Sequence, residues 1–162
     1  MSIVIRPAQK SDMGGVLQLI QELADFEREP DAVEVDRETL EADGFGAQPK
    51  FHCFVAARGD ELLGMALCYP RYSTWKGPAL HLEDLIVTES ARGIGLGSGL
   101  LTEVIRYARE NGARRVSWEV LDWNEPAIDF YKARGARILR DWDVVQLDAA
   151  GIDNYLKEYA GI

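Results

Sequence analysis

The stretch Arg92-Gly93-Ile94-Gly95-Leu96-Gly97-Ser98-Gly99 places four glycines at alternate positions behind an arginine. Glycine reaches backbone conformations that other residues avoid, and at the start of a helix such backbone can surround an anion with N–H groups. The apolar run at 80–87 predicts a strand before the glycines. The apolar pattern after them predicts a helix that stops at Asn111-Gly112. The stretch is therefore predicted to be a strand-to-helix loop that binds phosphate.

Spacing narrows the kind of phosphate loop. A dinucleotide-binding loop needs Gly-x-Gly-x-x-Gly, but counting from Gly93 or Gly95 puts Ser98 or Leu100 at the last position. A P-loop needs a lysine after its last glycine, and none follows here. The remaining pattern, Arg-x-x-Gly-x-Gly, resembles the acyl-CoA pyrophosphate loop of the GNAT superfamily of N-acetyltransferases. On this short pattern alone, a glycine turn without a ligand stays open.

Composition favours one cytoplasmic domain spanning residues 1–162. The chain is 47% hydrophobic, which is ample for a core, and no apolar stretch approaches membrane-spanning length. The opening residues lead into structure rather than a signal peptide. A net charge of −9 disfavours nucleic acid and anionic membranes and suits a cationic small molecule. Cys53 and Cys68 lack metal-like spacing, so we expect buried structural cysteines and no metal.

Hydrophobic periodicity predicts strands and helices in the order β-α-α-β-β-β-α-β-α-β. The first helix follows Ser11 and carries an apolar stripe from Met13 to Phe26, and the next covers about 36–42. The predicted strands cover 3–7, 51–57, 61–69, 79–88, 115–121 and 138–147, and a short helix covers 124–134.

Several further strings, in the right order, strengthen the resemblance. The chain resembles the spermidine/spermine (diamine) N-acetyltransferase family, and most closely its thialysine-acetylating branch. The matching strings are Asp43-Gly44-Phe45-Gly46, Leu82-Glu83-Asp84, the glycine loop itself, Trp123-Asn124-Glu125-Pro126 and Phe130-Tyr131-Lys132. The resemblance implies an α/β (α+β) domain whose mixed, mostly antiparallel sheet splays between strands 4 and 5 and is flanked by helices. It also implies acetyl-CoA as the acetyl donor, a small amine as the acceptor, and a homodimer.

Deprotonation of the amine is the central chemical problem of such an acyltransferase. An alkylamine has a pKa of about 10.4, so freeing its lone pair at pH 7 costs roughly 4.6 kcal/mol. Glu83 is the candidate base, because strand alternation places it with His81, Leu85 and Val87, and Asp84 on the other face. From the residues alone, Glu83 is also compatible with a surface carboxylate. The resemblance implies a base-like glutamate at this position.

Tyr131 is the candidate acid for the leaving thiolate. It lies seven residues after Asn124, so both share one helix face, where a tyrosine is also compatible with a plain core position. The resemblance implies the acid, with Asn124 as helix cap and cofactor contact. It also implies a cofactor site made of strand and loop residues and the start of the second helix: Leu85, Ile86, Val87, Arg92, Gly93, Ile94, Gly95, Leu96, Gly97, Ser98, Asn124, Glu125, Pro126, Ala127 and Tyr131.

The choice of amine depends on a different set of residues. The predicted acceptor site contains Phe26, Glu27, Trp75, Glu83, Asp84, Trp118 and Glu119. Polyamine-specific relatives carry an aspartate two residues before the tryptophan, where this chain has Ser73, and Lys76 adds a positive charge. This favours a lysine-like amino acid such as thialysine over a polycation. Polyamines, peptide amines and a CoA-binding module without catalysis stay open as alternatives.

Overall fold

The computed structural model describes residues 2–161, in two compact units that are each described by themselves. The first is Met1–Leu121 and the second is Asp122–Ile162. That residues 1–162 act as a single domain stays a prediction.

A five-stranded sheet forms the centre of the first unit, in the order β1-β2-β3-β4-β5. The first four strands are antiparallel neighbours, and β5 runs parallel to β4. The sheet is therefore mixed and mostly antiparallel, as predicted. The strands are β1 Val4–Pro7, β2 His52–Arg58, β3 Glu61–Ser73, β4 Gly77–Val87 and β5 Val116–Ser117.

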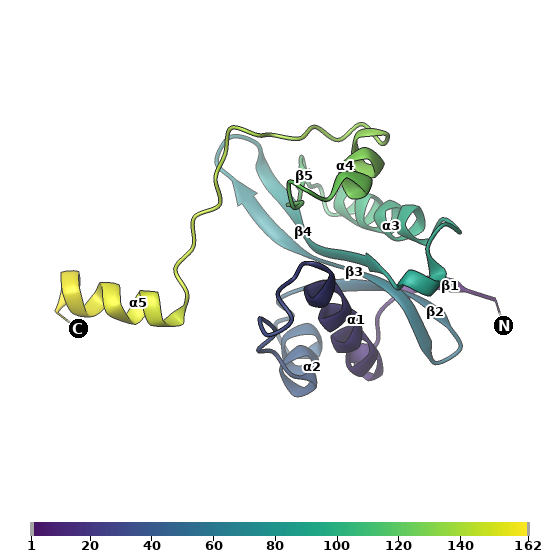
Figure 1. The fold of residues 1–162 in the computed structure, drawn as a ribbon, viewed down its shortest axis with the longest axis horizontal. Helices are drawn as coiled ribbons and strands as arrows, with labels where there is room; N and C mark the ends of the chain where they lie inside the picture. The colour runs from purple at the N-terminus through teal and green to yellow at the C-terminus, as the bar shows by residue number, and fades with distance from the viewer. Residues whose placement is uncertain (1, 162) are drawn as a thin grey trace. The chain divides into compact units, whose positions relative to one another are not determined.

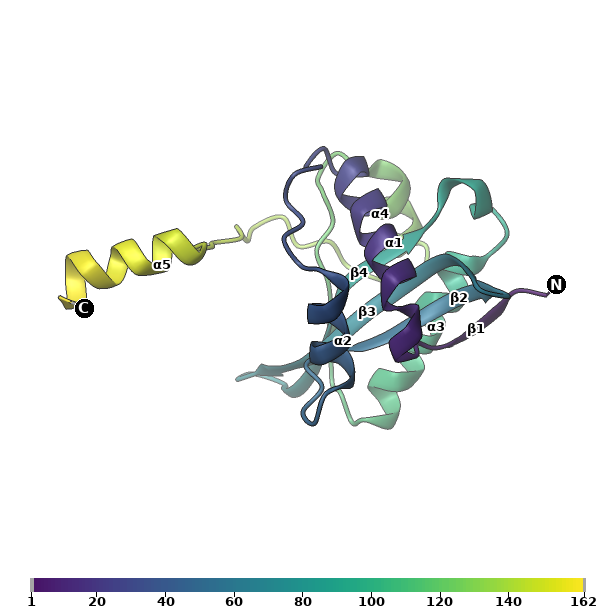
Figure 2. The ribbon, with the colours of Figure 1, turned by 90° about the horizontal axis from the view of Figure 1, so that it is seen from below.

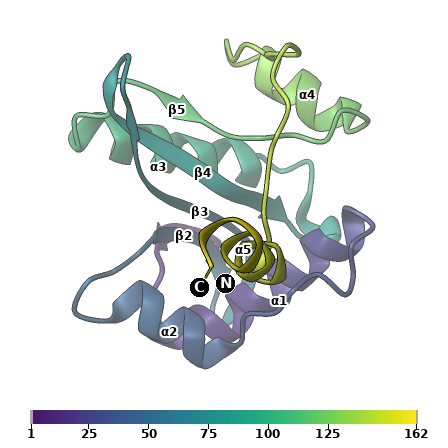
Figure 3. The same ribbon diagram turned by 90° about the vertical axis from the view of Figure 1, so that its left-hand side faces the viewer.

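Helices cover both faces of this sheet. Helices α1 (Met13–Phe26) and α2 (Arg37–Phe45) lie on one face, and α3 (Leu96–Glu110) lies on the other (Figures 1 and 3). Seen from below, α1 crosses the strands with α2 beside it (Figure 2). The short 3₁₀ segments η1 (Lys10–Asp12) and η2 (Glu89–Ala91) lead into α1 and the glycine loop.

Local sequence explains where the helices begin and how they pack. Asp36 caps α2 by accepting a 2.8 Å hydrogen bond from the Thr39 backbone N–H. The apolar stripe of α1 is buried against β2, β3 and β4, as the hydrophobic periodicity of this segment predicts. The buried core on this face contains Met13, Val16, Leu19, Leu40, Cys53, Val55, Met65, Leu67 and Ile86.

The prediction of a full fifth strand at 115–121 is only partly right. Strand β5 contains Val116 and Ser117 alone, which pair with Leu80 and His81. Beyond His81, β4 continues to Val87 without a β5 partner in the described chain. The sheet therefore opens between β4 and β5, which is the predicted splay.

The second unit contains α4 (Glu125–Lys132), α5 (Ala149–Tyr155) and the π-helical turn η3 (Leu156–Ala160). The predicted strand at 138–147 is wrong, because the structure has no strand there. A strand needs a hydrogen-bonded neighbour, and the described chain supplies none to this segment. Its side chains are exposed instead, with Val145 91% and Trp142 69% accessible.

Candidate active site

A β-bulge in β4 places the candidate base. Cys68 of β3 pairs with Leu82, and the preceding Leu67 pairs with Asp84, so Glu83 is left without a partner residue on β3. A bulge bends its strand and redirects the side chain at the extra residue. Glu83 is thereby presented at the sheet surface, where about half of its side chain is exposed.

The bulge also corrects the predicted faces of β4. Leu82 and Leu85 pair with Cys68 and Ala66, which share one face of β3. His81 and Asp84 pair with Tyr69 and Leu67, on the opposite face. The prediction that His81 shares a face with Leu85 and Val87 and opposes Asp84 is therefore wrong, because the extra residue interrupts the alternation.

Three carboxylates gather around this bulge. The pKa of Asp84 is raised to about 6, first by burial and then by the negative charges of Glu83 and Glu27. Burial also raises the pKa of Glu27, the residue that ends α1. An acidic group buried beside like charges binds a cation or a proton readily. This end of the first unit is thus suited to an ammonium group.

His81 and Tyr69 extend the cluster along the same face. Nε2 of His81 lies 3.6 Å from Oε2 of Glu83, and Nδ1 lies 3.4 Å from Oγ of Ser117. The Tyr69 ring centroid is 5.2 Å from that of His81. The pKa of Tyr69 is raised by burial, then by the charge of Glu83 and a hydrogen bond to it, and also by Glu119. Glu83 therefore lies among polar side chains from β3, β4 and the β5 segment.

The glycine loop begins where β4 ends. Gly93 and Gly95 have φ values of +83° and +90°, and a Cβ added at either would meet no atom within 4 Å. The loop thus presents bare backbone to open space, in a conformation that favours glycine. Arg92 secures it, because its Nε donates a 3.0 Å hydrogen bond to the Val87 carbonyl and its guanidinium lies 5.7 Å from the Phe26 ring centroid.

Helix α3 starts at the end of this loop. Gly95 is its N-cap and Leu96 its first residue, so the N–H groups of the first turn face the loop. The helix dipole favours an anion at this end. Gly99 has a different role, since a Cβ there would lie 2.3 Å from Cδ1 of Ile5, and glycine lets α3 approach β1. The loop and helix start together form a site suited to pyrophosphate.

Helix α4 carries the candidate acid. Asn124 caps it, with Oδ1 accepting a 3.4 Å hydrogen bond from the Ala127 N–H, and Pro126 stands in the first turn. Tyr131 is buried, and burial raises the pKa of its phenol. The phenol thus stays protonated at neutral pH and can donate a proton.

The tip of the β3–β4 hairpin carries Trp75, which is 83% exposed. Ser73 is buried there, and its Oγ accepts hydrogen bonds from the N–H groups of Trp75 (3.3 Å) and Lys76 (3.2 Å). Glu83 lies six positions after Gly77 along β4, a length of about 20 Å. Within the first unit, the tip is thus not brought to Glu83, and the acceptor role of Trp75 stays a prediction.

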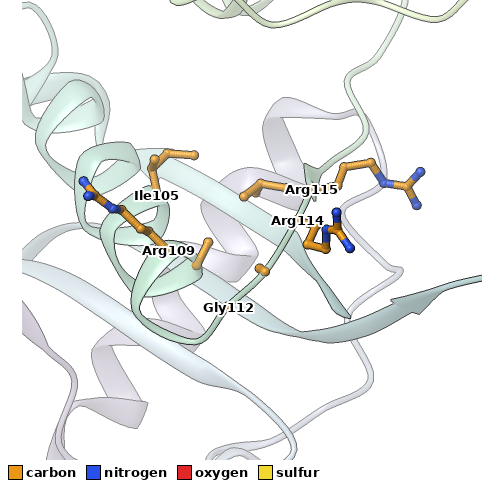
Figure 4. Close-up of a pocket in the computed structure, with 8 residues that line it drawn as sticks. Ile105, Arg109, Gly112, Arg114 and Arg115 are labelled. Carbon is orange, nitrogen blue, oxygen red and sulfur yellow. The ribbon is translucent and has the colours of Figure 1, made fainter. Parts of the chain in front are cut away.

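A shallow groove of about 370 Å³ lies elsewhere, at the end of α3 (Figure 4). Its lining includes Arg109, Arg114 and Arg115, but Arg109 points away from the other two (Figure 4). The groove is lined by Ile105, Ala108, Arg109, Gly112, Ala113, Arg114, Arg115 and Val116. It contains none of the predicted site residues, and its cations do not converge on one point.

The first unit thus brings Glu27, Glu83 and Asp84 together, with Glu119 near Tyr69. Phe26 joins the glycine loop through Arg92. Trp118 is partly buried directly after β5. Sequence reasoning missed Tyr69 and Ser117 as neighbours of His81, because only the strand register shows that the three are adjacent.

The described residues contain neither a candidate membrane span nor a candidate metal cluster. Within 2–161, no helix is long and apolar enough to cross a membrane. In the same range, no group of three or more His, Cys, Asp or Glu side chains is arranged to hold a metal ion. The absence of a metal in the reaction stays a prediction.

Comparison with known proteins identifies related chains. Residues 16–136 match the model of the acetyltransferase (GNAT) family. The chain is 41% identical over 148 residues to the thialysine N-epsilon-acetyltransferase of pig (Sus scrofa), covering 86% of this chain and 87% of that protein. It is 35% identical to the human (Homo sapiens) spermidine/spermine N(1)-acetyltransferase-like protein 1, covering 82% of this chain and 20% of that protein.

A solved structure shows the same fold. An aminoglycoside N-acetyltransferase in complex with CoA superposes with a TM-score of 0.73 at 18% identity, covering 91% of this chain and 96% of that one. At this identity, the likeness supports the fold alone.

Proposed function

Because the chain belongs to the acetyltransferase (GNAT) family and is an amine N-acetyltransferase, we propose that it acetylates the side-chain amine of thialysine or a related lysine-like amino acid. The observation that carries this proposal is the carboxylate cluster of Glu27, Glu83 and Asp84 at the β4 bulge. It offers a site for one ammonium group on the sheet that carries the glycine loop. The name of the pig relative supports the choice of a lysine-like amine.

The glycine loop and the start of α3 are suited to acetyl-CoA, which supplies the acetyl group as a thioester. The backbone of Gly93 and Gly95 faces open space, and an α-helix begins directly behind it. We assign the pyrophosphate to the loop from Arg92 to Ser98. Leu85 to Val87, at the open β4 edge, would contact the pantetheine and offer an N–H to the thioester oxygen. Asn124 to Ala127, at the start of α4, would complete the site.

Glu83 acts as the base in this proposal. Its carboxylate accepts a proton from the bound ammonium, which leaves the amine lone pair free to attack the acetyl carbon. Asp84 and Glu27 hold the ammonium near Glu83 through their charge. Tyr131 donates its phenolic proton to the sulfur as the thiolate leaves. The nitrogen releases its second proton to solvent as the amide forms, and Tyr131 is reprotonated from solvent.

Transfer is direct, without an acetylated enzyme. Cys68 and Cys53 are buried, and burial raises the pKa of the Cys68 thiol to about 12 and that of Cys53 further. A thiol must ionise to act as a nucleophile, so neither cysteine is suited to the task. Amine and donor are thus bound together when the acetyl group moves.

Polyamine acetylation is the second candidate function. The human polyamine-acetyltransferase-like relative favours it. Ser73 opposes it, since its hydroxyl is used in the hairpin turn and supplies no charge.

An acceptor screen with acetyl-CoA tests the proposal. We expect kcat/KM to be highest for thialysine among thialysine, lysine, ornithine, spermidine, putrescine and a lysine-containing peptide. Spermidine ahead by tenfold or more would establish the polyamine alternative, and the peptide ahead would establish a peptide acetyltransferase. Acetyl-CoA binding without turnover of any amine would indicate a CoA-binding module.

We also propose a homodimer that works in the cytoplasm, without nucleic acid or membrane as partners. Exposed apolar residues between 139 and 159 support the dimer, including Trp142, Val145 and Tyr159. Light scattering after size exclusion should give a mass near twice 18.1 kDa. A monomer mass at micromolar concentration would contradict the dimer.

A further inference from the structure

His81 is a buried imidazole inside the acceptor cluster, and no step proposed so far uses it. Only 7% of the residue is exposed, yet it lies between Tyr69 of β3 and Ser117 of β5 in the strand register. Its Nε2 is 3.6 Å from Glu83 Oε2, and its Nδ1 is 3.4 Å from Ser117 Oγ. Both ring nitrogens therefore have a polar neighbour, and the neighbour of Nε2 is Glu83, the proposed base.

We propose that His81 is a positioning residue that holds Glu83 and takes over the proton that Glu83 removes from the substrate ammonium. This inference rests on the proposed function, because it requires a protonated amine as substrate. It assigns no contact between His81 and either substrate.

The relay requires the tautomer of His81 that carries its hydrogen on Nδ1, and the Ser117 hydroxyl can stabilise it by accepting that hydrogen. The Nε2 lone pair is then free to take the proton once Glu83 is protonated. The second partner of a histidine sets which nitrogen is free for proton transfer. Ser117 is thus the residue that prepares His81.

The proton balance closes without another reagent. An N–H bond of the ammonium breaks and an O–H bond forms at Glu83, and that O–H bond then breaks as an N–H bond forms at His81 Nε2. Glu83 is again a carboxylate, beside an imidazolium cation, so the pair is neutral together. The proton returns through the half-exposed Glu83 to solvent after transfer.

A relay is useful here because a carboxylate holds a proton weakly. Imidazoles bind protons more tightly than carboxylates and exchange them near neutral pH. The ionisable groups around His81 are Glu83 and Asp84 on its own strand and Tyr69 on β3, with Glu119 near Tyr69 after β5. Each of these must be considered when a pH profile is assigned.

The test compares two amines in wild type and His81→Gln. Glutamine keeps a polar group toward Glu83 but cannot carry the proton. One amine is thialysine, and the other is a lysine analogue with two fluorines next to the amino carbon, which lower the amine pKa so that much of it is neutral at pH 7. We expect kcat/KM for thialysine at pH 7 to fall about tenfold or more, within the range of proton-transfer effects. The fluorinated amine should lose less than threefold.

Two further variants control for structure. His52→Gln removes the chain's other histidine, which stacks on Tyr107 with ring centroids 4.3 Å apart, and it should keep wild-type values for both amines. Ser117→Ala should reproduce the amine-dependent loss in weaker form, and it serves if His81→Gln fails to fold.

An equal loss on both amines, or no loss on either, would overturn the inference. If wild type prefers spermidine, the lysine-like assignment fails. The same comparison of wild type with His81→Gln, made with spermidine and a fluorinated spermidine, then tests the role of His81. A wild-type protein that acetylates no amine would overturn both proposals.

Discussion

The C-terminal end of β4 and the bulge within the strand carry the two halves of the proposed site, and the two halves differ in which atoms they present. The donor end, after Val87, consists of backbone: glycines at positive φ and the first turn of α3. The acceptor end, at the β4 bulge, consists of side chains: Glu83, Asp84 and His81.

This difference separates what each half decides. Backbone N–H groups recognise a pyrophosphate whatever amine is present, so the donor end is compatible with any acceptor. In the proposed mechanism, charged side chains brought together by one extra residue in β4 select a cation and remove its proton. Changes at one end should therefore alter donor affinity, and changes at the other should alter amine turnover.

The largest expected effect comes from a change on α4, at Tyr131, and it tests proton donation to the leaving thiolate. Tyr131→Phe should lower kcat about 100-fold to 1,000-fold while the Kd for acetyl-CoA changes less than threefold, because only the proton donor is lost. Rapid-quench kinetics and calorimetric titration measure the two quantities. Tyr107→Phe is the control and should keep wild-type kcat; a Tyr131→Phe variant with wild-type kcat would remove the acid role.

Asp84→Asn tests the cost of gathering acids at the acceptor end. Since the pKa of Asp84 is about 6 in the folded protein, above its usual 3.8, its ionisation opposes folding. The protonated Asp84 carboxyl therefore contributes fully to folding stability below pH 3.8, and this contribution is lost as the pH rises to about 6.

At pH 7.5, Asp84→Asn should therefore be more stable than wild type by about 1–3 kcal/mol, and its KM for the amine should rise. Urea unfolding between pH 4 and 7.5 measures the first effect. Parallel stability curves for the two proteins across this range would show that Asp84 does not titrate as described.

Gly95→Ala tests the donor end alone. A φ of +90° costs a residue with a Cβ about 1–2 kcal/mol, and relaxing it distorts the loop. Acetyl-CoA affinity should fall about tenfold, which corresponds to about 1.4 kcal/mol, while the amine KM is unchanged.

Gly112→Ala is the matched control, because Gly112 has a φ of +69° at the other end of α3. It should lose similar stability and keep its acetyl-CoA affinity. Equal affinities for both variants would argue against the loop as the donor site.

Ser73→Ala has the smallest expected effect and tests whether this serine belongs to the turn. Loss of the two hydrogen bonds to the Trp75 and Lys76 N–H groups should cost about 0.5–1.5 kcal/mol in urea unfolding. The neighbouring Thr74→Ala should cost less. A drop in amine kcat/KM without loss of stability would instead place Ser73 in the acceptor site.

The sequence predicted the glycine loop and α3 well because their signals are local. Alternating glycines, the apolar face of α3 and the stop at Asn111-Gly112 lie within one short stretch, and the structure confirms a loop followed by a helix that ends there. Glu83, Asp84 and Glu27 were also named, although their proximity depends on elements far apart in the chain.

The sequence-based predictions fail where the structure depends on pairing between strands that lie far apart in the sequence. The bulge at Glu83 depends on how β4 aligns with β3, so simple alternation gave the wrong face for Leu85 and Asp84. Residues 138–147 alternate like a strand, but the described chain offers them no neighbour. The relation of Tyr131 to Glu83 lies between two units, and their joint action stays a prediction.

The pH dependence of thialysine acetylation by wild type and Glu83→Gln tests the central claim most directly. If Glu83 is the base, the variant should lose about 100-fold in kcat/KM at pH 7, and less than tenfold at pH 10, where much of the amine is already neutral. A variant that matches wild type at every pH, or that loses the same factor at pH 7 and pH 10, would contradict the account.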